Sequence, residues 1–200
     1  MAKPNPKLKP EKAILSIRPR VRSREVASFL AQLDELSGRM LADMASCTPA
    51  ELAWQPKPGM NTIGMLLAHN ALVEAFWVTV AQHRCSPAEA VKRSRPVMRV
   101  SFDLDGMPMP AGAKPPRGLA GWTMARYRAL HDRARAFSKR ATRTWNDAYL
   151  DPTMRYVRMN GQVRILNVRW ILYHVLEHQA GHYGQMLLLR HQYRDRLKKR

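Results

Sequence analysis

The stretch that decides the fold is residues 167–192, NVRWILYHVLEHQAGHYGQMLLLRHQ. Apolar side chains recur in it at helical spacing and no proline interrupts it, which predicts one helix of about seven turns at ~3.6 residues per turn. His178 and His182 are four residues apart, so they lie on one helix face with Gln185 and apolar side chains. A buried imidazole without a partner costs on the order of 1–3 kcal/mol. A metal ion with a further ligand from a second helix would satisfy both rings.

Three more long helices with apolar stripes are predicted, over residues 23–46, 62–83 and 122–146. Ser23 is the expected N-cap of the first, and Asn61 that of the second. His69 lies on the apolar face of the second helix, which makes it the candidate third ligand. Glu74 lies well around the same helix and is predicted to face solvent.

The segments between the long helices contain strong stop and start signals. Ser/Thr-Pro-Ala-Glu occurs at residues 48–51 and 86–89 and predicts two short helices, the second ending near Lys92. Residues 93–120 are rich in proline and glycine and predict a long connection, with a short extended piece at 97–104. A crossover of this length would let two consecutive long helices run parallel.

Asn160-Gly161 is the dipeptide that a type I′ turn prefers, and it predicts a hairpin between residues 156–159 and 162–165. An isolated hairpin is only marginally stable, so it must pack on the helices. The predicted fold is all-α: a four-helix bundle with a long loop between helices two and three and a small hairpin before helix four.

Composition sets further bounds on the chain. It has 200 residues and is 46% hydrophobic, which is typical of one folded domain, and no charge-free apolar run is long enough to predict a membrane span. The N-terminus lacks the apolar region of a secretory signal, and Cys47 and Cys85 form no disulfide framework pattern, so a cytoplasmic setting is expected. Residues 1–22 are predicted to be a basic, proline-rich, disordered arm, 23–192 the bundle, and 193–200 a basic tail.

The quoted histidine stretch has a parallel in a known family. Residues 61–69 (NTIGMLLAH), 73–77 (VEAFW) and 174–185 (HVLEHQAGHYGQ) resemble the DinB-like (DinB/YfiT-like) family of metal-dependent enzymes, with likeness over about residues 24–192. The resemblance implies an up-down-down-up bundle, a homodimer, and a divalent metal ion. It also implies a small-molecule substrate and, in members that use mycothiol or bacillithiol, a low-molecular-weight thiol.

The ligands that the resemblance implies are His69, His178 and His182. His174, Gln185 and Glu177 are expected around them, where they would orient ligands or substrate. The metal is a divalent ion such as Zn, Ni, Fe or Mn. The expected activity is that of an S-transferase or hydrolase, in which the ion activates a thiol or water toward a small electrophilic substrate.

Two alternatives stay open at this point. The 34 basic and 15 acidic residues give a net charge of +19, which would attract nucleic acid, but no recognised DNA-binding motif accompanies the charge, so the expected binding is non-specific. The second alternative is a bundle that binds metal without catalysis.

Overall fold

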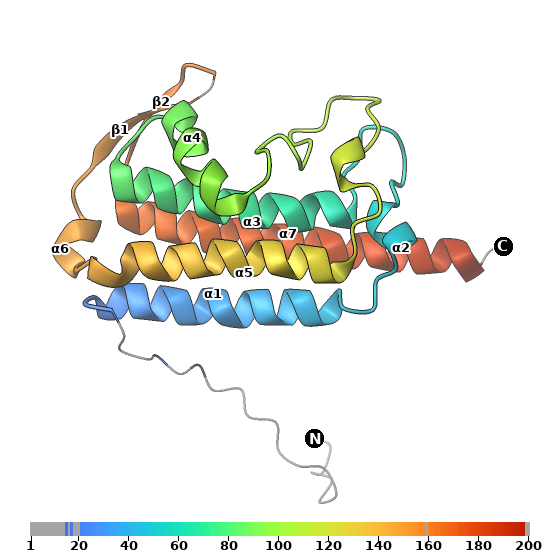
Figure 1. The fold of residues 1–200 in the computed structure, drawn as a ribbon, viewed down its shortest axis with the longest axis horizontal. Helices are drawn as coiled ribbons and strands as arrows, with labels where there is room; N and C mark the ends of the chain where they lie inside the picture. Colours follow the sequence, from blue (N-terminus) through green and yellow to red (C-terminus); the bar gives the residue numbers. More distant parts are fainter. Residues whose placement is uncertain (1–14, 16, 18–20, 159, 199–200) are drawn as a thin grey trace, which may run out of the picture.

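A computed structural model of the protein describes residues 15, 17, 21–158 and 160–198, and these are mostly helical (Figure 1), which confirms the predicted all-α character. The helices are α1 (Arg24–Asp43), α2 (Pro49–Ala53), α3 (Ile63–His83), α4 (Pro87–Met98), α5 (Met124–Ala141), α6 (Asp147–Leu150) and α7 (Val168–Lys198), with 3-10 turns η1 (Arg117–Leu119) and η2 (Thr142–Thr144). Strands β1 (Met154–Val157) and β2 (Val163–Leu166) pair antiparallel. Most of the predicted arm, residues 1–22, lies outside the described residues.

Helices α1, α3, α5 and α7 lie lengthwise along one another. Helix α3 packs on α5 and α7, and α1 packs on α7. Figure 1 shows that α3 and α5 run in one direction and that α1 and α7 run in the opposite one. The chain returns from the end of α3 to the start of α5 through α4 and the irregular segment 99–116, which is the crossover that the sequence predicted.

Helix α3 is the central helix. It contacts α2, α4, α5 and α7, and its neighbours bury residues around most of its circumference. It is long and apolar enough to cross a membrane by composition, but 78% of its most apolar window is buried inside the molecule, as in the core helix of a soluble protein.

Side-chain caps set most helix starts where the sequence predicts them. The side-chain oxygens of Ser23, Thr48 and Ser86 each accept a hydrogen bond from the backbone N–H three residues further on. The prediction for α3 was wrong by one residue. Thr62, with extended backbone angles of φ −104° and ψ 162°, caps this helix in place of Asn61.

Helix α4 is longer than predicted, because it continues past Lys92 and includes Pro96. A proline in a helix removes one backbone hydrogen bond. Pro96 lies in the last turn of α4, so little of the helix follows the missing bond. Arg99 then adopts the left-handed conformation, with φ +57°, and ends the helix. The predicted extended piece at 97–104 is therefore wrong: it begins as the last turn of α4 and continues as turns.

The ends of the other long helices also differ from prediction. Helix α5 ends at Ala141, and Asn146 caps the additional short helix α6, which the sequence did not indicate. Helix α7 continues past Gln192, so residues 193–198 of the predicted tail are helical.

The hairpin is present, but its turn is not the predicted one. Val157 pairs with Val163, so the connection is longer than a two-residue turn. Gly161 donates its N–H to the Arg158 carbonyl (2.9 Å) and has φ +80°. This hydrogen bond makes Gly161 the last residue of the turn, whereas the predicted turn requires it in the third position.

A buried polar network joins the four long helices and corrects the prediction that Glu74 is solvated. Glu74 is 1% exposed. Its carboxylate accepts hydrogen bonds from Arg135 Nε (2.9 Å), Arg135 Nη2 (3.2 Å) and Ser138 Oγ (2.7 Å). Ser37 Oγ accepts from both Arg135 Nη2 and Gln179 Nε2, at 2.7 Å each. The buried carboxylate is therefore fully paired, as an interior charge must be.

A buried histidine, His131 on α5, lies near this network but forms its hydrogen bond to a backbone carbonyl instead. It is 4% exposed, its Nε2–H donates to the Leu67 carbonyl (2.9 Å), and its Nδ1 has no hydrogen-bond partner among the described residues. Burial lowers its pKa to about 4, with the Glu74 carboxylate opposing and the Arg135 charge adding to the shift. His131 is therefore neutral in the folded protein at pH 7.

Acid is expected to destabilise the fold through His131. The unfolded chain takes up a proton below about pH 6.5, whereas the folded state resists it down to about pH 4. The contribution of His131 to the free energy of unfolding is therefore at its maximum above pH 6.5. It falls by about 3 kcal/mol as the pH drops to about 4. Urea unfolding at pH 7 and pH 4, with chelator present, measures the loss. His131→Gln should lose about 3 kcal/mol less than the wild type, and equal losses would contradict the prediction.

Candidate metal centre

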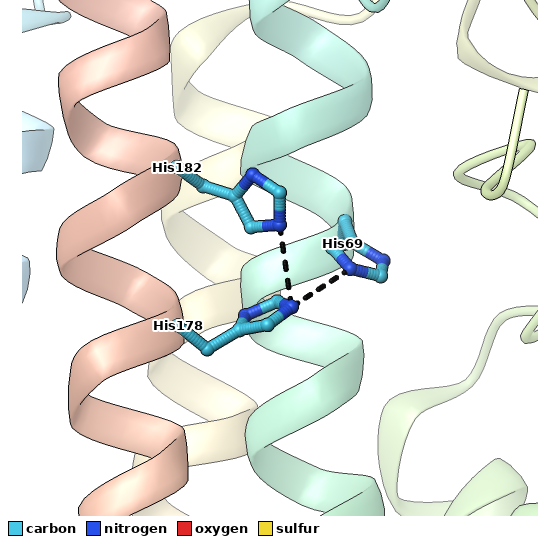
Figure 2. A group of neighbouring side chains, drawn as sticks. All are labelled: His69, His178 and His182. Carbon is cyan, nitrogen blue, oxygen red and sulfur yellow. Dashed lines mark hydrogen bonds between the residues drawn. The ribbon is translucent and has the colours of Figure 1, made fainter.

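Three histidines from two adjacent helices point toward one another (Figure 2). His69 comes from α3, and His178 and His182 come from successive turns of α7. The Nε2 atoms of His69 and His182 each lie 3.2 Å from His178 Nε2. One ligand atom from each ring lies within 4.8 Å of the other two. The structure thus brings the three residues predicted as ligands into one cluster.

The two outer rings are held through their other nitrogen. His69 Nδ1 lies 2.7 Å from Asp105 Oδ2, and His182 Nδ1 lies 2.9 Å from Gln185 Oε1. Carboxylate and amide oxygens are acceptors, so each Nδ1 donates its proton and each Nε2 presents a lone pair. His178 Nε2 lies between these two lone pairs and can donate its proton to only one of them at a time. With that proton on Nδ1 instead, all three Nε2 atoms could bind one cation. The donor set therefore fits a metal ion.

The surroundings keep His178 and His182 uncharged. Burial lowers the pKa of His178 to about 3, and the neighbouring His69, His182 and His174 lower it further. Burial also lowers the pKa of His182, against the opposing hydrogen bond to Gln185. Metal ligands must be unprotonated, so both rings are ready to bind an ion at neutral pH.

His174 lies beside the cluster. Its Nδ1 is 3.2 Å from Glu177 Oε2, and its ring stacks on Trp170 with centroids 4.7 Å apart. Trp77 meets the same ring edge-on at 5.3 Å, and the ring centroid of His178 lies 5.6 Å away. His174 therefore packs against one ring of the cluster. Glu177, which was expected to orient ligands or substrate, contacts His174.

Asp105 is a site residue that the sequence patterns did not indicate. It lies in the irregular segment 99–116 and is 4% exposed. Loop residues have no periodicity from which burial can be read. The only local signal is that Gly106 follows, with φ +65°, so the chain turns sharply just after Asp105.

Comparison with known proteins agrees with this geometry. A model of the DinB superfamily matches residues 23–186, which include the three histidines and Asp105. The chain belongs to the DinB superfamily. This confirms the resemblance stated above, and metal binding is general in that superfamily, as the histidine cluster leads one to expect. A search of curated proteins finds no match to this DinB-superfamily chain.

Proposed function

We propose that this DinB-superfamily protein is a metal-dependent enzyme that uses a thiol or water to attack a small electrophilic substrate. The main support is the convergence of three imidazoles, His69, His178 and His182, within 4.8 Å. Three side-chain ligands leave coordination positions open, which is typical of catalytic and not of structural sites. A divalent ion such as Zn, Ni, Fe or Mn, when bound, lowers the pKa of a bound water or thiol so that a nucleophile exists near neutral pH.

The chain's own residues would supply orientation and partial burial. Asp105 and Gln185 hold two of the ligand rings through their Nδ1 atoms. Packing between α3 and α7 partly buries His178, which strengthens electrostatic effects at that position. The half-buried rings of Trp77 and Trp170, with His174, form a wall beside the centre that would contact the substrate.

The same proposal covers the assembly. The four long helices would form the four-helix bundle of the family, in its up-down-down-up order, and two copies would associate as a homodimer. The homodimer is inferred from the family, and light scattering of the purified protein would measure it.

Turnover should depend on both metal and a nucleophile. The test is a panel of low-molecular-weight thiols against reactive electrophiles, with a parallel panel that lacks thiol. Activity should disappear with chelator and return with added ion. A thioether product would identify an S-transferase, whereas substrate cleavage without thiol would identify a hydrolase. Turnover that chelator leaves unchanged, or none across both panels, would overturn the proposed activity.

A further inference from the structure

The buried carboxylate of Asp105 has two separate partners. Its Oδ2 lies 2.7 Å from His69 Nδ1, and its Oδ1 accepts the Met107 backbone N–H at 3.0 Å. The carboxyl side chain is 6% exposed and the His69 side chain is 17% exposed. A carboxylate so far from water is stable only with partners of this kind. The imidazole of His69 is one of them.

The segment around Asp105 is attached to the fold by other contacts. The Ala113 carbonyl accepts hydrogen bonds from Gly59 N–H (2.9 Å) and Gln55 Nε2 (3.0 Å). Phe102 and Leu104 pack against the hydrophobic core. Apolar packing and backbone bonds thus hold segment 99–116 without the Asp105 side chain, so its burial against His69 needs a separate explanation.

We infer that Asp105 is a positioning residue for the metal centre and that it couples ion binding to the placement of segment 99–116. By accepting the Nδ1–H of His69, it holds this ring as the tautomer whose Nε2 lone pair faces His178 and His182. A carboxylate at this position also makes the imidazole a better ligand, and loss of such a partner typically weakens metal affinity about 10–100-fold. Linkage requires that the ion in turn strengthen the hold on the segment. The inference rests on the metal centre proposed above, but not on turnover.

The tautomer of His69 can be measured without any ion. Nitrogen-15 NMR of the metal-free protein should show the proton on Nδ1 of His69 in the wild type. In Asp105→Ala, which has no acceptor there, the proton should redistribute toward Nε2. Asp105→Asn keeps one acceptor oxygen and should lie between the two. Asp103→Ala is the matched control, because Asp103 is an exposed carboxylate in the same segment.

Cobalt titration followed by visible absorption measures the effect on binding. The dissociation constant should rise about 10–100-fold in Asp105→Ala, less in Asp105→Asn, and by less than about twofold in Asp103→Ala. Amide exchange at Met107 should slow on adding the ion in the wild type and in Asp103→Ala, but not in Asp105→Ala. Unchanged tautomer and affinity in both Asp105 variants, or equal weakening in Asp103→Ala, would overturn the inference. If the wild type binds no cobalt, the proposed enzyme and the coupling both fail, and the tautomer measurement still decides whether Asp105 positions His69.

Discussion

Replacing His182 with alanine is expected to remove the bound ion from the purified protein while the helices stay folded. The Nε2 atoms of His69 and His178 would remain, but two imidazoles hold an ion far more weakly than three. The affinity for the ion should fall by more than about 100-fold, which exceeds the effect of losing a residue that only supports a ligand. Metal analysis should find roughly one ion per chain in the wild type and close to none in the variant. Circular dichroism of both proteins checks the fold.

The matched control for this prediction is His191→Ala. His191 is an exposed histidine on the same helix, α7, so its loss changes the histidine count without touching the cluster. It should keep the ion content of the wild type. Equal and negligible metal in the wild type and both variants would remove the basis for the metal centre, and equal loss in His191→Ala would show that the ion binds elsewhere.

Arg135→Ala is expected to lower the free energy of unfolding far more than the loss of a surface ion pair does. It would leave the Glu74 carboxylate, which is 1% exposed, without its cation, and a buried charge that loses its partner typically costs about 3–5 kcal/mol. Urea unfolding at pH 7 measures this loss. Arg93→Ala is the control, because the Arg93–Glu89 pair joins neighbouring turns of α4 at the surface. Its removal should cost less than about 1 kcal/mol.

A double variant separates pairing from packing. Glu74→Leu with Arg135→Met removes both charges and fills similar volume, and such replacements are often neutral or stabilising. The two serines of the network keep partners. Ser37 Oγ donates to the Leu33 carbonyl (2.6 Å), and Ser138 Oγ, without Glu74, can donate to the Ala134 carbonyl (3.1 Å). The double variant should therefore be more stable than Arg135→Ala alone. If Arg135→Ala costs no more than Arg93→Ala, the buried pair has no special role.

The helices and the histidine cluster could be predicted because both depend on local spacing. Ser23, Thr48 and Ser86 cap helices by bonding to a backbone N–H three residues on, so the signal is complete within one turn. His178 and His182 share a helix face for the same reason. The choice of His69 needed only the apolar face of a second helix.

Glu74 and Asp105 could not be placed because their surroundings are distant in the sequence. The partly exposed face of α3 carries apolar side chains such as Val73 and Trp77, whereas Glu74 lies on a buried side. A polar side chain was therefore assigned to solvent on the wrong face of this helix. Its partner Arg135 is 61 residues away. Asp105 depends on the path of an irregular segment, for which neither period nor capping residue gives a signal.

The distance between the two halves of the histidine cluster along the chain has a consequence for how the ion is acquired in a cell. His69 and His178 are 109 residues apart. At about 5–20 residues per second, the ribosome needs roughly 5–20 s to make the intervening chain. During this time the nascent protein offers only one of the three imidazoles of the cluster, and one such ring competes poorly for scarce transition metals. A metal ion would therefore bind only after α7 has docked, and the folded protein would select it from the ions available at that moment.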